Sequence, residues 1–213
     1  MNQFIAYLTK NNRLTSHQSS NKKAHSTETL NILLTDKILK AMDKKQITAL
    51  VLLDLSKAFD SIDHARLLHK LSILGASPST VKWFKSYLTG RRQYVGSTHS
   101  DTLPITHGVP QGAILSPLLF CIYLNDLPTA PKFCNLESYV DDSKLFLSFP
   151  LVELDAAIEK LEQDLHSVAH WCCENHLLIN PNKTKLLFLG TRQMLSRLPE
   201  DPRVVFLDPR VVF

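Results

Sequence analysis

The chain has 213 residues, with 24 Lys and Arg against 20 Asp and Glu, and 44% of its residues are hydrophobic. This apolar content excludes a disordered chain, and 6 glycines with 11 prolines exclude a collagen-like or low-complexity protein. The small positive charge permits contact with nucleic acid but does not demonstrate it. The length allows one large domain or two small ones.

Cysteine usage and the N-terminal sequence bear on where the protein resides. The four cysteines form no C-x-x-C pair, which favours neither a disulfide framework nor a zinc site. The start MNQFIAYLTKNNR lacks the pattern of a signal peptide, and the chain has no run of roughly 18 apolar residues that would span a membrane. We therefore expect an intracellular protein of the nucleus or cytoplasm, neither secreted nor in a membrane.

The first half of the chain starts with a polar segment, residues 1–25, that we expect to be irregular. Apolar residues at three- and four-residue steps then predict helices over residues 26–45, 67–74 and 77–90. The continuous apolar run 47–55 predicts a strand buried on both faces, with Asp54 at its end. Trp83 and Phe84 fall in the apolar stripe of the last helix and are expected in the core.

The second half of the chain adds a hairpin and a long amphipathic helix. Short strands are predicted at 91–95, 138–140, 144–147, 176–179 and 186–189. Gly and Pro predict a loop at 107–112, and helices are predicted over 117–124 and 154–172. The tail repeats the string DPRVVF, which we interpret as a duplication. This mixed order of elements predicts an α+β fold.

Three carboxylates lie where charge is costly or concentrated. Asp54 ends a buried strand, and Asp141 and Asp142 occupy the turn of the predicted hairpin. Clustered carboxylates prefer a hard cation such as Mg²⁺, bound together with substrate phosphate. Two such ions promote in-line phosphoryl displacement, so the pattern favours phosphoryl transfer. On these residues alone, the alternative is a surface Asp-Asp turn and an unrelated strand end.

Three strings in the chain resemble successive palm motifs of reverse transcriptases. They are VLLDLSKAFDSIDH at 51–64, HGVPQGAILSPLLF at 107–120 and YVDD at 139–142. Three further strings fit the same family: HSTETL at 25–30, LTGRRQYV at 88–95 and LLINPNKTK at 177–185. The resemblance is strongest to jockey-like non-LTR retrotransposons and covers about residues 14–192. The ordered set is far more specific than any one string.

The resemblance implies an RNA-directed DNA polymerase that adds dNTPs to a DNA primer on an RNA template, using two Mg²⁺ or Mn²⁺ ions. Asp54, Asp141 and Asp142 match the catalytic metal-binding aspartates. Leu55 matches the position whose backbone carbonyl contacts a metal in the nucleotide site. Lys183 matches a catalytic lysine thought to protonate the departing pyrophosphate, and its plainer interpretation is an ordinary turn lysine.

The resemblance also places a nucleotide pocket and a template path. Phe59 matches an aromatic ring that leaves no room for a ribose 2′-hydroxyl, and plain core packing is compatible with that role. Gln111 and Gly112 match the loop that lines the nucleotide and template pocket, where glycine allows close backbone approach. Arg91 and Arg92 are candidates for template phosphates, with a solvated basic turn as the alternative.

The chain departs from the family pattern near its start. Lys22 takes the place of the arginine in a Gln-x-Gly-Phe-Arg string, which keeps the charge for nucleotide binding but loses the bidentate grip. The resemblance implies a polymerase palm of split βαβ topology, an antiparallel sheet with helices on one face. We expect a partial fingers remnant at 1–25, the palm at 26–192, an irregular tail at 193–213, and no thumb.

Two hypotheses of function stay open on sequence alone. In the first, the chain is a truncated fragment of a reverse transcriptase that retains metal-dependent polymerase chemistry. In the second, it is a degenerate or repurposed palm that is catalytically inactive and at most binds nucleic acid. The sequence does not predict an oligomeric state.

Overall fold

The computed structural model describes residues 2–18, 26–93 and 102–199 of the chain. Lys22, the last two residues of the predicted strand at 91–95, and both copies of DPRVVF lie outside the described residues. Within the described part, no helix is both long enough and apolar enough to cross a membrane.

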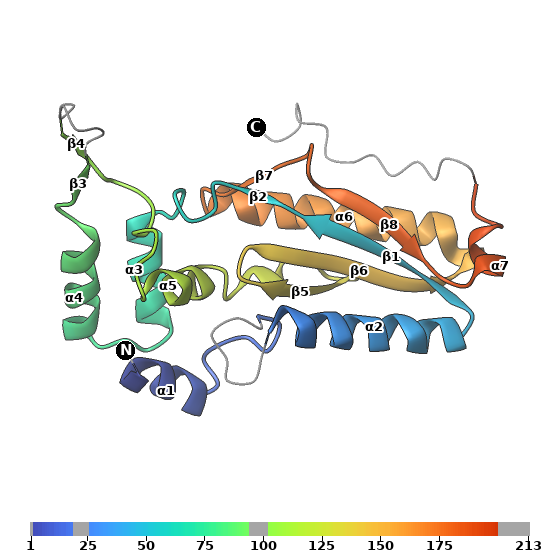
Figure 1. Cartoon of the computed structure of the whole chain (residues 1–213), viewed down its shortest axis with the longest axis horizontal. Coiled ribbons are helices and arrows are strands. Elements are labelled where there is room, and N and C mark those ends of the chain that lie inside the picture. Colours follow the sequence, from blue (N-terminus) through green and yellow to red (C-terminus); the bar gives the residue numbers. More distant parts are fainter. Residues whose placement is uncertain (1, 19–25, 94–101, 200–213) are drawn as a thin grey trace.

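A four-stranded antiparallel sheet forms the centre of the fold (Figure 1). Its strand order is β5 (Asn135–Tyr139), β6 (Asp142–Pro150), β1 (Gln46–Leu53) and β8 (Lys185–Leu189). Because β6 and β8 are both antiparallel to β1, they run parallel to each other on either side of it. The helix α6 (Leu154–Glu174) connects them. This is a split βαβ unit, and the predicted α+β palm topology is confirmed.

Helices cover both faces of this sheet, which corrects the expectation of helices on one face. Ala49 and Val51 belong to the large core that includes the buried side of α6. Leu50 and Phe146 lie on the opposite face of the strands and pack against Leu34 of α2 (Thr27–Asp43). Side chains along a strand alternate between the two faces of the sheet. Because a helix covers each face, both sets of β1 side chains are apolar.

Three of the predicted helices begin at side-chain caps. Ser26 caps α2 with a capping box to Thr29, and Asp63 accepts from the backbone N–H of Arg66 at the start of α3 (His64–Ile73). Ser77 caps α4 (Pro78–Leu88), which has proline in its first turn. Each cap satisfies backbone donors that have no partner within the helix.

The N-terminal segment is not irregular throughout, as the sequence analysis expected. Residues Asn2–Lys10 form the helix α1, whose Leu8 is fully buried. The Phe4 ring packs on Phe84 of α4 with ring centroids 5.8 Å apart. A short amphipathic helix gives a weak sequence signal, and here contacts with distant segments stabilise it. Phe84 is buried as expected, whereas Trp83 is 55% exposed, which corrects its predicted core position.

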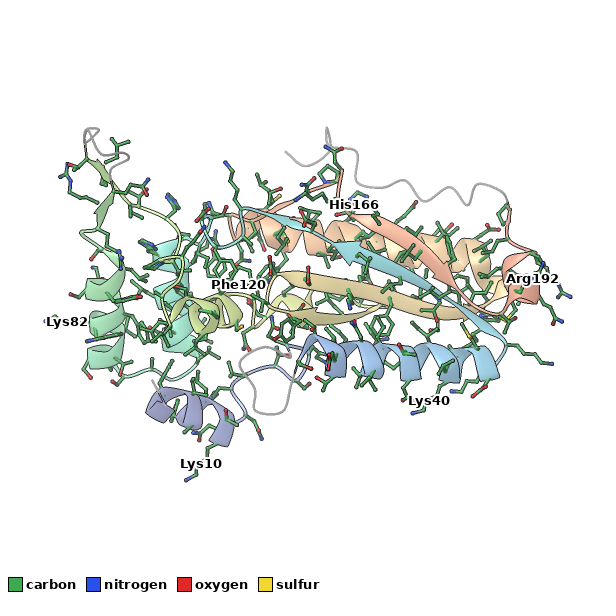
Figure 2. The ribbon with its side chains drawn as sticks, in the orientation of Figure 1. Lys10, Lys40, Lys82, Phe120, His166 and Arg192 are labelled. Carbon is green, nitrogen blue, oxygen red and sulfur yellow. The ribbon has the colours of Figure 1, made fainter. Side chains whose placement is uncertain are left out.

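The remaining elements are short and complete the molecule (Figure 1). They are β2 (Leu55–Ser56), β3 (Arg92–Gln93), β4 (Leu103–Pro104), α5 (Ser116–Tyr123), η1 (Leu127–Thr129), η2 (Leu151–Glu153), β7 (Leu178–Ile179) and α7 (Arg192–Leu195). Figure 2 shows Phe120 of α5 among the interior side chains, while Lys10, Lys40 and Lys82 project outward. The helix α5 is almost wholly buried and packs against α3.

Candidate active site

The predicted acidic residues meet at one edge of the central sheet. Asp54 directly follows β1, and Asp142 is the first residue of β6. The ladder pairs Leu53 with Ser143, so continuing it by one residue brings the backbone of Asp54 beside that of Asp142. Two segments far apart in the sequence are thus joined at this edge by strand register.

The turn before Asp142 has an unusual backbone conformation. Tyr139 pairs with Asp142, which leaves Val140 and Asp141 as a two-residue hairpin turn. Val140 has a φ of 55°, a left-handed conformation that β-branched residues rarely adopt. The favoured two-residue hairpin turns have a positive φ at their first central residue, so strand pairing imposes this conformation on a residue that does not favour it.

A cavity of about 440 Å³ lies at this sheet edge. Six of the residues singled out from the sequence line it: Asp54, Leu55, Phe59, Gln111, Asp141 and Lys183. Asp54 is partly exposed, and Asp141 is exposed. Neither carboxylate is buried, so both are open to a ligand and to solvent.

Asn180 and Lys183, which also line the cavity, are held beside Asp54 by a small second ladder. The strand β7 pairs with β2, and the Asn180 N–H donates to the Asp54 carbonyl oxygen at 2.8 Å. Lys183 Nζ lies 3.8 Å from Asp54 Oδ2, and the lysine side chain is 69% exposed. The structure therefore brings Lys183 to the first aspartate, although an ion pair this exposed adds little stability.

The loop at 107–112 is held against the chain after β2. Gly108 has a φ of 81°, and a Cβ there would lie 2.9 Å from backbone atoms of Asp60. The Gly108 N–H donates to the Ile62 carbonyl oxygen at 2.8 Å, and the Gly108 carbonyl lies 2.7 Å from His64 Nε2. Only glycine fits both this conformation and this approach. Gln111 Nε2 then donates to Asp60 Oδ1 at 2.9 Å.

Phe59 is both a core residue and a wall of the cavity. Its ring stacks on that of Phe120, with centroids 4.5 Å apart and an interplanar angle of 19°. The same side chain lines the cavity beside Asp54 and Gln111. Core packing and a cavity-facing role therefore hold together, as the sequence analysis allowed.

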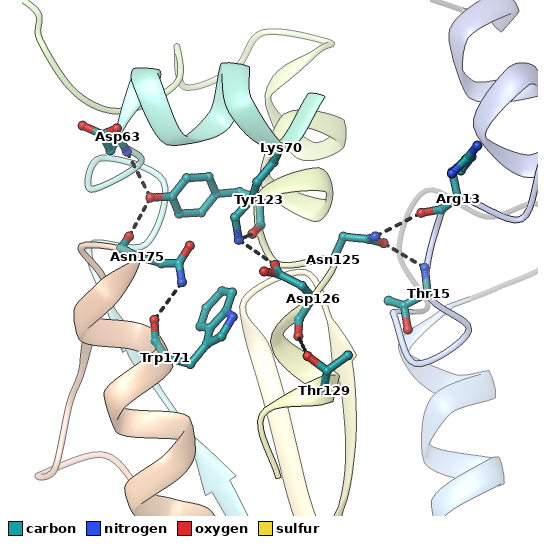
Figure 3. Close-up of polar contacts among 10 residues, drawn as sticks. All are labelled: Arg13, Thr15, Asp63, Lys70, Tyr123, Asn125, Asp126, Thr129, Trp171 and Asn175. Carbon is teal, nitrogen blue, oxygen red and sulfur yellow. Dashed lines mark hydrogen bonds and ion pairs between the residues drawn. The ribbon is translucent and has the colours of Figure 1, made fainter. Parts of the chain in front are cut away.

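The Tyr123 hydroxyl joins the start of α3 to the end of α6 (Figure 3). It donates to the Asn175 carbonyl oxygen at 2.6 Å and accepts from the Asp63 N–H at 3.4 Å. Burial raises the pKa of Tyr123 to about 12, so the hydroxyl stays protonated at neutral pH. Lys70 donates to the Tyr123 carbonyl oxygen at 2.7 Å and to Asp126 at 2.6 Å, and burial lowers its pKa.

Several predicted residues lie elsewhere in the described structure. Gly112 lines an apolar cavity of about 870 Å³ together with Trp83 and Phe4. Arg91 and Arg92 line a third cavity of about 520 Å³, where Arg92 donates to Thr102. Asp142 is exposed, and it is absent from the described lining of the acidic cavity. The roles assigned to these four residues stay predictions.

Three residues of the site were missed by sequence reasoning. Gln18 is 5% exposed and hydrogen-bonds both backbone groups of Val140. Asp60 and Asn180 line the acidic cavity. Asp60 and Asn180 fall inside the quoted motifs, so motif membership was an available signal for them. Gln18 had only its place in a disrupted string, and its contact spans 122 positions.

The residues at the cavity are compatible with a divalent cation but do not form a complete cage. Among the described residues, no group of three or more His, Cys, Asp or Glu side chains is arranged to hold a metal ion. Three aspartates, Asp54, Asp60 and Asp141, nevertheless line one cavity, and Asp60 accepts a hydrogen bond from Gln111. Mg²⁺ is usually bound by one or two carboxylates plus water and substrate phosphates, so this donor set fits.

The split βαβ sheet, with acidic residues after its central strand and in the neighbouring hairpin turn, defines the class: a polymerase palm. Comparison with known proteins agrees. The family described as reverse transcriptase (RNA-dependent DNA polymerase) matches residues 1–206. The chain therefore belongs to the reverse transcriptase family.

The chain is also similar to individual members of this family. It is 34% identical over 186 residues to a probable RNA-directed DNA polymerase from transposon BS of Drosophila melanogaster, covering 83% of this chain and 20% of that protein. It is 32% identical over 155 residues to the RNA-directed DNA polymerase from mobile element jockey of Drosophila funebris, covering 68% of this chain and 16% of that protein. The expected resemblance to jockey-like non-LTR elements is thus confirmed.

Among solved structures, a telomerase of Candida tropicalis in complex with a TWJ fragment of telomeric RNA matches with a TM-score of 0.64. The match covers 87% of this chain and 33% of the telomerase chain at 15% identity, and it shows the fold alone. Reverse transcriptases generally use divalent metal ions. The chain spans 20% of the length of the transposon BS relative.

Proposed function

We propose that the chain carries the nucleotidyl-transfer centre of an RNA-directed DNA polymerase, which joins dNTPs to a DNA primer 3′-hydroxyl on an RNA template. The observation that carries the proposal is the meeting of Asp54 and Asp141 on one cavity with Gln111 and Lys183. Because the chain spans 20% of the transposon BS relative, the activity and partners of the whole protein belong to this proposal.

Asp54, Asp141 and Asp142, with the Leu55 carbonyl, would hold two Mg²⁺ or Mn²⁺ ions. When bound, the ions would supply charge that activates the primer hydroxyl and neutralises the triphosphate. The exposure of Asp141 and the partial exposure of Asp54 support this role, because both carboxylates are accessible without rearrangement of the core. The register of β1 and β6 supports the inclusion of Asp142.

Lys183 and Gln111, which line the same cavity, would both act on the nucleotide. Lys183 Nζ lies 3.8 Å from Asp54 Oδ2, where its ammonium would donate a proton to the departing pyrophosphate. Gln111 is held by Asp60 and would orient the incoming base or sugar together with the backbone at Gly112.

Phe59 would favour deoxynucleotides. Its stacking on Phe120 fixes the ring in the core, so the ring cannot easily move away from a 2′-hydroxyl. A rigid wall discriminates by steric exclusion, whereas a mobile side chain would yield.

The nucleic-acid path is proposed from charge alone. Arg91 and Arg92 would contact template phosphates, and Arg92 is oriented by its two hydrogen bonds to Thr102. Lys22 would contact the triphosphate. The division into a fingers remnant at 1–25, a palm at 26–192 and a tail at 193–213 stays a prediction.

Primer extension on an RNA template tests the proposal. We expect Mg²⁺- or Mn²⁺-dependent addition of dNTPs, abolished by Asp141→Asn and retained by Asp36→Asn, an exposed aspartate on α2. Binding of the primer–template without extension, in a chain shown to be folded, would instead support the inactive palm that only binds nucleic acid.

A further inference from the structure

Gln18 is attached to the hairpin turn that contains Asp141. Its Nε2 donates to the Val140 carbonyl oxygen at 3.2 Å, and the Val140 N–H donates to its Oε1 at 3.1 Å. One side-chain amide therefore binds the donor and the acceptor of a single turn residue. Glutamine and asparagine are the side chains that offer both groups on one planar amide, and the longer glutamine spans this gap.

The backbone around Gln18 is itself fixed to the sheet. Gln18 forms a parallel bridge with Ser138, and the Ser138 N–H donates to the His17 carbonyl oxygen at 2.8 Å. Next to this bridge, the buried Glu137 carboxylate lies 3.2 Å from His17 Nδ1 and 2.9 Å from Lys37 Nζ. This single bridge to β5 fixes the backbone from which the Gln18 side chain extends.

The turn that Gln18 binds needs an external support. Val140 has a φ of 55°, and a β-branched residue in this region is strained. Its side chain is only partly buried against the core, and the next residue, Asp141, is exposed. The two hydrogen bonds from Gln18 favour the left-handed conformation over the extended alternatives that valine prefers.

We propose that Gln18 is a positioning residue, which holds the Val140–Asp141 turn so that the Asp141 carboxylate faces the cavity that Asp54 also lines. The inference rests on the proposed function in one respect, the binding of a divalent cation by these carboxylates. It assigns a role in the polymerase site to the N-terminal segment, 122 residues before the turn it binds.

The direct test measures Mn²⁺ binding to the chain by electron paramagnetic resonance. No nucleotide or primer is present. Gln18→Met keeps the length of the side chain and removes both hydrogen-bonding groups. We expect it to weaken Mn²⁺ binding about tenfold, because a tenfold change in affinity corresponds to the net free energy of about one or two hydrogen bonds. Gln163→Met makes the same chemical change at an exposed position of α6 and should leave the affinity unchanged.

A second substitution separates positioning from general stability. Val140→Gly removes the conformational strain, so the turn needs the Gln18 amide less. In this background Gln18→Met should weaken Mn²⁺ binding less than about threefold, a coupling that independent sites do not show. Circular dichroism establishes that each variant is folded.

The outcomes are distinct. Equal loss of affinity from Gln18→Met in both backgrounds, or no loss in a folded variant, overturns the positioning role. A folded unsubstituted chain that binds no Mn²⁺ overturns it as well. If Mn²⁺ binding follows the expected pattern but the chain never extends a primer, the role of Gln18 is supported. Only the polymerase proposal then fails.

Discussion

Gly108 provides a sharp test of how the loop at 107–112 is attached to the chain that follows β2. Gly108→Ala adds one methyl group at a φ of 81°, where that methyl would lie 2.9 Å from both Cα and O of Asp60. The conformation alone costs about 1–2 kcal/mol. Forcing backbone apart adds about 1–3 kcal/mol, because neither segment has a flexible side chain end that can yield.

Gly90→Ala is the matched control for this change. Gly90 also has a positive φ, of 73°, but a Cβ there meets no atom within 4 Å. We therefore expect Gly90→Ala to lower the free energy of unfolding by about 1–2 kcal/mol, the conformational cost alone. Gly108→Ala should lower it by about 2–5 kcal/mol, the sum of both costs.

Urea unfolding followed by circular dichroism measures both values. The difference between the two variants isolates the close approach of the loop to Asp60, and the slope of the unfolding transition should stay unchanged. Equal destabilisation by the two substitutions would refute the reasoning, because it would mean that the loop and the Asp60 backbone separate at no cost.

Three further predictions concern the interior and the cavity. Tyr123→Phe leaves the backbone carbonyl at the end of α6 without its donor, and it should lower the free energy of unfolding by about 1–3 kcal/mol in the same urea assay. Burial raises the pKa of Cys172 to about 12, whereas Cys173 is exposed. Iodoacetamide at pH 8 should therefore label Cys173 and spare Cys172 until urea unfolds the chain. Equal labelling of the two cysteines, measured by mass spectrometry, would contradict this prediction. If the chain extends primers, Phe59→Val should raise the incorporation of ribonucleotides relative to deoxynucleotides by at least about tenfold, or roughly 1.4 kcal/mol in discrimination. An unchanged ratio would exclude Phe59 as the steric wall.

Much of the palm was predictable because its signals are local. The apolar run at 47–55 and the regular apolar steps at 154–172 each correspond to a single element, β1 and α6. Asp54 and Asp141 stood out because one is a charge at the end of an apolar strand and the other lies in a hairpin turn, and the ordered set of palm motifs then assigned them to a metal site. The structure brings both to one cavity.

The contacts that complete the site were not predictable from local pattern. Gln18 binds Val140 through a single amide, and nothing in the spacing of a glutamine indicates which backbone it will contact. The apolar run at 47–55 predicted a strand buried on both faces, but it did not indicate that α2 is the element that covers the second face. The helix α1 depends on Phe4 packing against α4, a contact made only in the folded chain.

The most direct test of the central claim is primer extension on an RNA template by four forms of the chain: unsubstituted, Asp54→Asn, Asp141→Asn and the double variant. If the two carboxylates serve one catalytic centre, each single substitution should abolish Mg²⁺-dependent extension, and the double variant should be no worse than either single one. Independent, multiplicative losses from the two substitutions, or extension by a folded Asp54→Asn,Asp141→Asn variant at the unsubstituted rate, would contradict a shared catalytic site at the end of β1.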